Sequence, residues 1–171
     1  MNFNDIEIAQ MPDVPVLMDI FVKCTDQMKA NGIEQWHYDY PNEQGISKDI
    51  DEETVFVIND DSGGLGTITL NNDQDEQYQQ VQWKYTDGKV LVIHRLAVHP
   101  RSQGMGLGKK LCLFAEHFAK EKGFSIIRLD AYSGNPASNH IYTQLGYHKA
   151  DGLCEFHNNA LPFYCYEKEI V

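Results

Sequence analysis

The stretch Gln103-Gly104-Met105-Gly106-Leu107-Gly108 stands directly before Lys109 and Lys110. Its three glycines lack the Cβ atoms that would hold a ligand away from the backbone. Apolar residues recur at helical spacing from Leu107 onwards, which predicts that a helix begins here. The unpaired amides and the positive dipole end of that helix would face any group bound at the glycines. The stretch is therefore predicted to bind an anion.

The elements on either side of the glycines predict a parallel pair of strands joined by a helix. Residues 90–98 are apolar on both faces, as a central strand requires, and His99-Pro100 ends them. The helix that begins at Leu107 is predicted to stop near Gly123, and residues 126–131 form a second buried strand. This order predicts a right-handed βαβ unit.

The rest of the chain predicts further helices and strands around this unit. Helices are expected at about 14–31, 42–51 and 135–145, and the strands at 3–9, 55–58, 65–70, from 147 and at 161–170. The last two strands are expected to be antiparallel. Residues 71–80 are predicted to be a polar, mobile loop, with 78–85 as an alternative extension of the sheet.

Composition limits the function classes. The 171 residues are 42% hydrophobic and 23% charged, which is typical of a single globular domain covering 1–171. A net charge of -11 argues against a nucleic-acid partner. No apolar run is long enough to span a membrane, no basic amphipathic segment would bind its surface, and residues 1–10 lack signal-peptide features, so we expect a cytoplasmic protein.

The charged residues are unevenly distributed. Between Gly88 and Ala115 there is no Asp or Glu. A cationic patch around the glycines is one interpretation, and chance clustering on a solvated face is the other. The cations of this window are Lys89, Arg95, Arg101, Lys109 and Lys110.

The cysteines do not indicate a metal site or a disulfide framework. Cys24, Cys112, Cys154 and Cys165 are scattered, without a CxxC motif and without histidines at metal-binding spacing. We expect reduced thiols in or near the core, and no bound metal.

Two familiar phosphate-binding motifs fail at the glycines. A dinucleotide fingerprint starting at Gly104 would need Gly or Ala where Lys109 stands. A P-loop ending at Gly108-Lys109 would need Ser or Thr at Lys110, and Gly at Gln103. The anion is therefore predicted to be held in a different way.

A third pattern fits. Leu96-Ala97-Val98-His99-Pro100 followed by Gln103-x-x-Gly106-x-Gly108 resembles the acetyl-CoA site of the GNAT superfamily of N-acetyltransferases. A second match is similar to the Asn-rich helix of that family and its Tyr-x-x-x-Gly-Phe ending, with Tyr147 in place of Phe. Together they span about 90–147. The residues of the second match are Asn135, Asn139, Tyr142 and Leu145-Gly146-Tyr147.

The resemblance implies an α/β (α+β) fold and a cofactor site. The expected sheet is mixed and mostly antiparallel, with six to seven strands, a central parallel βαβ pair and about four flanking helices. Acetyl-CoA would be the cosubstrate. Its pyrophosphate would bind the amides of Gln103, Gly104, Met105, Gly106, Leu107 and Gly108 with Lys109, Lys110 or Arg101 nearby, its pantetheine would bind Leu96, Ala97 and Val98, and Asn135 and Asn139 would contact the same arm.

The resemblance also implies two catalytic residues. An alkylamine with a pKa of about 10.4 must lose a proton before it can attack. Many family members carry a carboxylate on this strand, but residues 90–98 contain none, and His94 is the candidate base; a histidine satisfied inside the sheet is the alternative. Tyr142 matches the tyrosine that protonates the leaving thiolate, with helix packing as the alternative.

The acceptor is the least defined part of the prediction. The expected reaction transfers acetyl to a primary amine of a small molecule or peptide by direct attack in a ternary complex. A non-catalytic acyl-CoA-binding module is the alternative, because the strand carboxylate is missing. Trp36 and Tyr40 are candidate substrate contacts, although core packing explains such aromatics equally well. The oligomeric state stays open between a monomer and a homodimer.

Overall fold

The computed structural model describes residues 1–171 and divides into two compact units. The first unit contains residues 1–70 and 95–114, and the second contains residues 71–94 and 115–171. Strand β4 (Val90–Val98) and helix α3 (Leu107–Glu121) each contribute to both units. The single domain expected from the composition stays a prediction.

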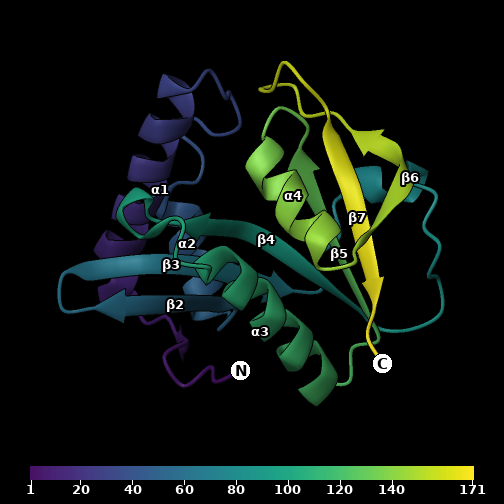
Figure 1. Ribbon diagram of the computed structural model, residues 1–171, viewed down its shortest axis with the longest axis horizontal. Helices are drawn as coiled ribbons and strands as arrows, with labels where there is room; N and C mark the ends of the chain where they lie inside the picture. The colour runs from purple at the N-terminus through teal and green to yellow at the C-terminus, as the bar shows by residue number, and fades with distance from the viewer. The chain divides into compact units, whose positions relative to one another are not determined.

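One mixed sheet contains all seven strands, in the order β1-β2-β3-β4-β5-β7-β6 (Figure 1). The pairs β1–β2, β2–β3, β5–β7 and β6–β7 are antiparallel, and β4–β5 is parallel. The mostly antiparallel fold with one parallel pair is therefore confirmed. The other strands are β1 (Glu7–Ile8), β2 (Val55–Asp60), β3 (Gly63–Asn71), β5 (Ile126–Tyr132), β6 (His148–Cys154) and β7 (Phe163–Glu169).

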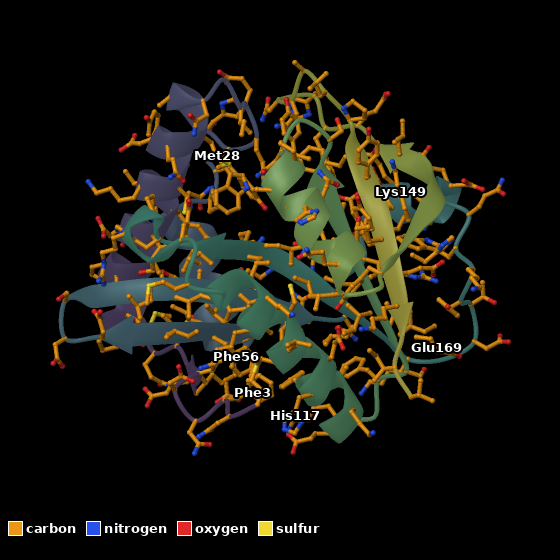
Figure 2. The ribbon with its side chains drawn as sticks, in the orientation of Figure 1. Phe3, Met28, Phe56, His117, Lys149 and Glu169 are labelled. Carbon is orange, nitrogen blue, oxygen red and sulfur yellow. The ribbon has the colours of Figure 1, made fainter.

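The first unit is built on α1 (Val14–Ala30), α2 (Glu43–Asp51) and the β2–β3 hairpin. Leu17 and Ile20 of α1 have no exposed surface and belong to its apolar core. Phe3, near the start of the chain, and Phe56 of β2 both make edge-on contacts with the ring of Phe114 in α3; Figure 2 labels Phe3 and Phe56. These aromatic contacts secure the first half of α3 to β2.

The second unit is built on β5, β7, β6 and α4 (Pro136–Gln144), with α4 lying against β5 (Figure 1). Glu167 of β7 is completely buried, and its carboxylate accepts hydrogen bonds from the backbone amides of Lys84 and Tyr85. Because a buried carboxylate needs donors, these bonds hold the segment before β4 in place.

Two sequence expectations differ from the structure in this region. Residues 71–80 include the short 3₁₀ helix η2 (Glu76–Gln80), whose Tyr78 is buried and hydrogen-bonded to Asp130. Residues 78–85 do not extend the sheet as a strand, since only an isolated bridge joins Gln82 to Asp151. The buried tyrosine explains why a segment of polar composition is ordered there.

The remaining elements follow the predicted order. Strand β1 is shorter than the predicted 3–9, and the other two short 3₁₀ helices are η1 (Met11–Asp13) and η3 (Pro100–Ser102). All four cysteines are free thiols and are buried. No helix combines the length and the apolar character needed to cross a bilayer.

Candidate active site

The glycine loop lies between β4 and α3 in the first unit. Strand β4 ends at Val98, η3 follows, and α3 begins at Leu107 as predicted. Gly104 and Gly106 have φ values of +81° and +79°, which L-residues adopt only with strain. A Cβ atom at either glycine would meet no atom within 4 Å. The glycines therefore serve the backbone conformation and leave open space above the loop, as a bound phosphate requires.

Most cations of the first unit near this loop already have acidic partners. Lys110 Nζ lies 2.6 Å from both carboxylate oxygens of Asp5, and Arg101 forms two bonds with Asp60, at 3.0 and 3.2 Å. Arg101 lowers the pKa of the Asp60 carboxyl by donating these bonds. Lys109 is exposed and forms no ion pair. It is therefore the cation with the most freedom to meet a phosphate.

The strand segment Leu96 to Val98 leads into the loop. The carbonyl oxygen of Val98 accepts from Gln103 Nε2 at 3.1 Å and from the thiol of Cys24 at 3.2 Å. Burial raises the pKa of Cys24 to about 12, so this thiol keeps its proton and acts as a donor. The side chain of Gln103 thus fixes the entry to the loop.

The parallel pairing of β4 with β5 is short. It covers the pairs Val90–Ile126 to Val92–Arg128 and then ends. Leu96 to Val98 lie in the part of β4 beyond these pairs.

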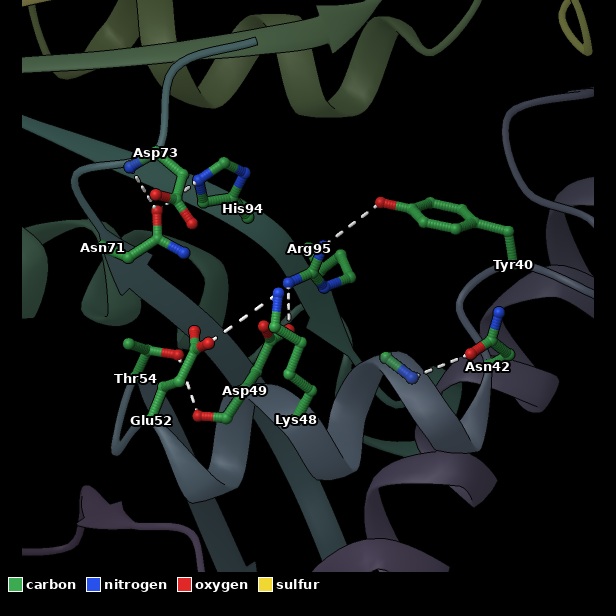
Figure 3. Close-up of polar contacts among 11 residues, drawn as sticks. Tyr40, Asn42, Lys48, Asp49, Glu52, Thr54, Asn71, Asp73, His94 and Arg95 are labelled. Atoms are coloured by element: carbon green, nitrogen blue, oxygen red, sulfur yellow. Dashed lines mark hydrogen bonds and ion pairs between the residues drawn. The ribbon is translucent and has the colours of Figure 1, made fainter.

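Arg95 interrupts β4 with a left-handed backbone, φ 47°. Its guanidinium is ion-paired with Asp49 of α2 and donates to the hydroxyl of Tyr40 at 3.2 Å (Figure 3). The alternation of faces predicted for residues 90–98 assumes an extended backbone throughout, so it does not continue across Arg95. No pattern in the sequence indicates a left-handed arginine within a strand.

His94 belongs to the second unit and has an asparagine partner. Its Nε2 lies 2.7 Å from Oδ1 of Asn71, the last residue of β3 (Figure 3). The same oxygen accepts from the backbone amide of Asp73 at 2.9 Å. The sequence analysis named His94 as the candidate base but did not name Asn71, because the two residues are 23 positions apart and a single asparagine belongs to no motif.

Tyr142 lies on α4 of the second unit and is buried. Asn135 caps this helix, since its side chain accepts from the backbone amide of Ser138 at 3.3 Å. The ring of Tyr142 packs against the rings of Tyr147 and Tyr166, with centroids 5.9 and 5.5 Å away. Both helix packing and a catalytic hydroxyl are compatible with this position.

Asn139 is engaged within the second unit. Its amide nitrogen donates to the carbonyl oxygens of Tyr132 and Asn135, at 2.9 and 2.8 Å. Its amide oxygen accepts from the hydroxyl of Tyr166 at 2.7 Å. Both donor hydrogens are therefore used, and the amide holds α4 to β5 and β7. The predicted contact of Asn139 with pantetheine stays a prediction.

The two aromatic acceptor candidates differ in exposure. Trp36 is 7% exposed and makes an edge-on contact with Phe21 of α1, which supports the packing alternative. Tyr40 is 49% exposed, with its hydroxyl at Arg95. Tyr40 is thus the more accessible of the two.

The predicted site residues are distributed over the two units. The first unit holds the glycine loop, Leu96 to Val98, Lys109, Trp36 and Tyr40, and the second holds His94, Asn135, Asn139 and Tyr142. Within each unit the structure adds neighbours that the sequence did not indicate. These neighbours are Asp49 beside Arg95, and Asn71 beside His94.

Comparisons with known proteins identify relatives of this chain and solved structures with the same fold. An uncharacterized N-acetyltransferase, YesJ, of Bacillus subtilis is 26% identical over 95% of this chain and 88% of its own. An acetyltransferase of the GNAT family from Streptococcus agalactiae has the same fold, with a TM-score of 0.81 at 22% identity over 96% and 94% of the two chains. The PaiA N-acetyltransferase of Thermoplasma acidophilum, solved in complex with coenzyme A, superposes with a TM-score of 0.71 at 18% identity over 96% and 97%.

The family itself is identified by its sequence profile. The profile of the Acetyltransferase (GNAT) family matches residues 16–147, which include both motifs and most of the chain. The glycine loop and the Asn135 to Tyr147 segment both fall within this one match. The chain belongs to the acetyltransferase (GNAT) family, and the protein is an acyltransferase.

Proposed function

We propose that the protein transfers an acetyl group from acetyl-CoA to a primary amine of a small molecule or peptide, by direct attack in a ternary complex. The glycine loop carries this proposal. Gly104 and Gly106 combine left-handed backbones with open space, and α3 begins directly after them. A helix start of this kind favours a diphosphate because its amides and its dipole both face the negative charge.

The cofactor contacts follow the resemblance residue by residue. The amides of Gln103 to Gly108 hold the pyrophosphate, and Lys109 meets a phosphate. The backbone of Leu96 to Val98 binds the pantetheine as an added strand would, which the early end of the β4–β5 pairing supports. Asn135 and Asn139 contact the same arm, the second through the remaining acceptor capacity of its oxygen. A relative with this fold was solved with coenzyme A, which also supports the proposal.

The chemistry needs one proton removed and one supplied. Bound acetyl-CoA supplies the activated acyl group. The amine nitrogen forms a bond to the thioester carbon while His94 accepts the proton that the nitrogen loses. As the carbon–sulfur bond breaks, the Tyr142 hydroxyl donates a proton to the sulfur. A backbone amide of Leu96 to Val98 stabilises the charge that develops on the carbonyl oxygen.

The acceptor is proposed to be cationic before it loses its proton. Tyr40 is exposed, and the exposed carboxylates of Asp51 at the end of α2 and of Glu53 after it add negative charge, which favours an amine over an anionic acceptor. Tyr40 would contribute an aromatic wall. The role of Trp36 would be to support that wall from the core.

A panel of amines tests the proposal. The protein is mixed with acetyl-CoA and polyamines, arylalkylamines, amino sugars or peptides, while free thiol release is followed and the products are identified by mass spectrometry. Acetylated product with equimolar thiol is the expected result. Tight binding of acetyl-CoA by calorimetry without thiol release for any amine would support the binding-module alternative instead.

A further inference from the structure

We propose that Asn71 is a positioning residue that fixes the neutral imidazole of His94 in its Nε2–H tautomer, so that Nδ1 is the nitrogen that accepts the proton of the amine. The part that concerns the amine rests on the proposed function. The part that concerns the tautomer rests on three residues of the second unit, Asn71, Asp73 and His94, whose contacts Figure 3 shows.

The orientation of the Asn71 amide is determined by the backbone of Asp73. Its two ends differ in chemistry, since the oxygen only accepts and the nitrogen only donates hydrogen bonds. The backbone nitrogen of Asp73 lies 2.9 Å from the atom assigned as Oδ1. A backbone N–H can only donate, so the atom opposite it must be the oxygen. The Asp73 amide therefore fixes which end of Asn71 faces His94.

The tautomer of His94 follows from the orientation of the Asn71 amide. Nε2 of His94 lies 2.7 Å from the same Asn71 oxygen, a distance at which one of the two atoms must donate a hydrogen. Because the oxygen cannot donate, Nε2 must carry the hydrogen. A neutral imidazole has one N–H, so its lone pair for proton transfer is on Nδ1.

The contact with Asn71 is also compatible with a protonated His94. When Nδ1 accepts a proton, Nε2 still donates to Asn71, so the bond persists through the reaction. The same hydrogen bond therefore orients the ring both before and after the proton transfer. Asn71 is neutral and does not hold the imidazolium as a carboxylate would, so the proton can leave again.

Nitrogen NMR reads the tautomer directly. The protein is labelled with ¹⁵N-histidine, and His94 is assigned among the seven histidines by comparison with His94→Ala. Above the pH at which His94 becomes neutral, the expected spectrum has a protonated Nε2 and an unprotonated Nδ1. A spectrum with the proton on Nδ1 would overturn the proposal without any enzyme assay.

Three variants test the role of the asparagine oxygen. Asn71→Ala removes the acceptor, so both tautomers should appear, and kcat should fall about fivefold with an unchanged KM for acetyl-CoA, the factor that corresponds to one ordinary hydrogen bond. Asn71→Asp keeps an acceptor oxygen for both donors, so it should keep the wild-type tautomer. Asn72→Ala is the matched control, because Asn72 is an exposed asparagine next in the chain.

The outcomes separate this inference from the proposed function. An Asn71→Ala protein with the wild-type tautomer and kcat would overturn the role of Asn71 even if acetyl transfer is robust. A pH-rate profile unaltered by His94→Ala would instead remove His94 as the base, while the spectrum would still decide on the tautomer. The spectrum therefore tests Asn71, and the rate tests His94.

Discussion

Arg95 of β4 and Asp49 of α2 form an ion pair with side chains that are 16% and 14% exposed, although Arg95 has a left-handed backbone. Burial raises the pKa of the Asp49 carboxyl above its ordinary value, and Arg95 opposes that rise. Nε of Arg95 is also buried and makes no hydrogen bond. The pair therefore holds a costly conformation in place.

Removing one partner of this pair is expected to destabilise the first unit. Asp49→Ala leaves the Arg95 guanidinium half-buried and without its carboxylate, so the free energy of unfolding should fall by about 2 kcal/mol, below the range for a fully buried pair. Urea denaturation measures the change. Lys48→Ala on the same helix is the control, because its pair with Glu52 is exposed and should contribute less than about 0.5 kcal/mol.

The glycine loop gives a prediction about cofactor affinity. Gly106→Ala places a Cβ in the open space above the loop and strains a residue with φ +79°. We expect the KM for acetyl-CoA to rise about tenfold, equivalent to about 1.4 kcal/mol of binding free energy.

Gly123→Ala separates backbone strain from ligand contact. Gly123 follows α3, has φ +72°, and likewise has no atom within 4 Å of an added Cβ. The Gly123→Ala variant should lose stability as Gly106→Ala does, but it should keep the wild-type KM for acetyl-CoA. Equal effects of the two variants on KM would argue against the loop as the pyrophosphate site.

The hydroxyl of Tyr142 is expected to affect turnover but not binding. Tyr142→Phe keeps the ring contacts with Tyr147 and Tyr166 and removes the proton donor. A thiolate with a parent pKa of about 8.5 leaves readily, so kcat should fall about tenfold, less than the loss expected for an indispensable acid. Steady-state kinetics measure it. Tyr147→Phe is the control, and an unchanged kcat for Tyr142→Phe would remove the role.

The proposed role of His94 as the base can be tested by the pH dependence of kcat/KM. Without His94, the reaction depends on amine that is already deprotonated, and the fraction of this form rises with pH. His94→Ala should therefore lose most activity at low pH and approach the wild type as the pH nears the pKa of the amine. Profiles of kcat/KM between pH 6 and 10 test this, and a uniform loss at every pH would point to a structural role.

Asp130 predicts a pH dependence of stability in the second unit. Burial raises the pKa of its carboxyl, which accepts from Tyr78 at 2.6 Å. The carboxyl of an unfolded aspartate has a pKa of about 3.9, so Asp130 in the native protein keeps its proton to a higher pH. The stability that the raised pKa provides is fully present below the unfolded pKa of about 3.9 and is lost as the pH rises through the native pKa.

Asp130→Asn should remove this part of the pH dependence. The difference in unfolding free energy, wild type minus Asp130→Asn, should fall as the pH rises from 4 to 8, by about 1.4 kcal/mol for each unit by which the native pKa is raised. Urea denaturation at each pH measures it. Asp151→Asn, at an exposed position on β6, is the control, and a flat difference for Asp130 would contradict the raised pKa.

Local patterns were sufficient for most of the fold. The periodicity of residues 14–31 predicted α1, and the apolar run of residues 90–98 predicted β4 with its correct ends. The segment 71–85 was harder, because Tyr78 and Glu167 order it through contacts with residues far along the chain. Polar composition alone cannot reveal such contacts.

The sequence by itself determined the order of elements, the glycine loop and the family, because periodicity and short motifs depend on neighbouring residues. Only the tertiary structure decided that Asp5 neutralises Lys110, that Asp49 pairs with Arg95 and that Asn71 faces His94. These partners are 105, 46 and 23 positions apart. The physical reason is that charge pairing and tautomer depend on distances in space, which the folded strands set and a local pattern does not encode.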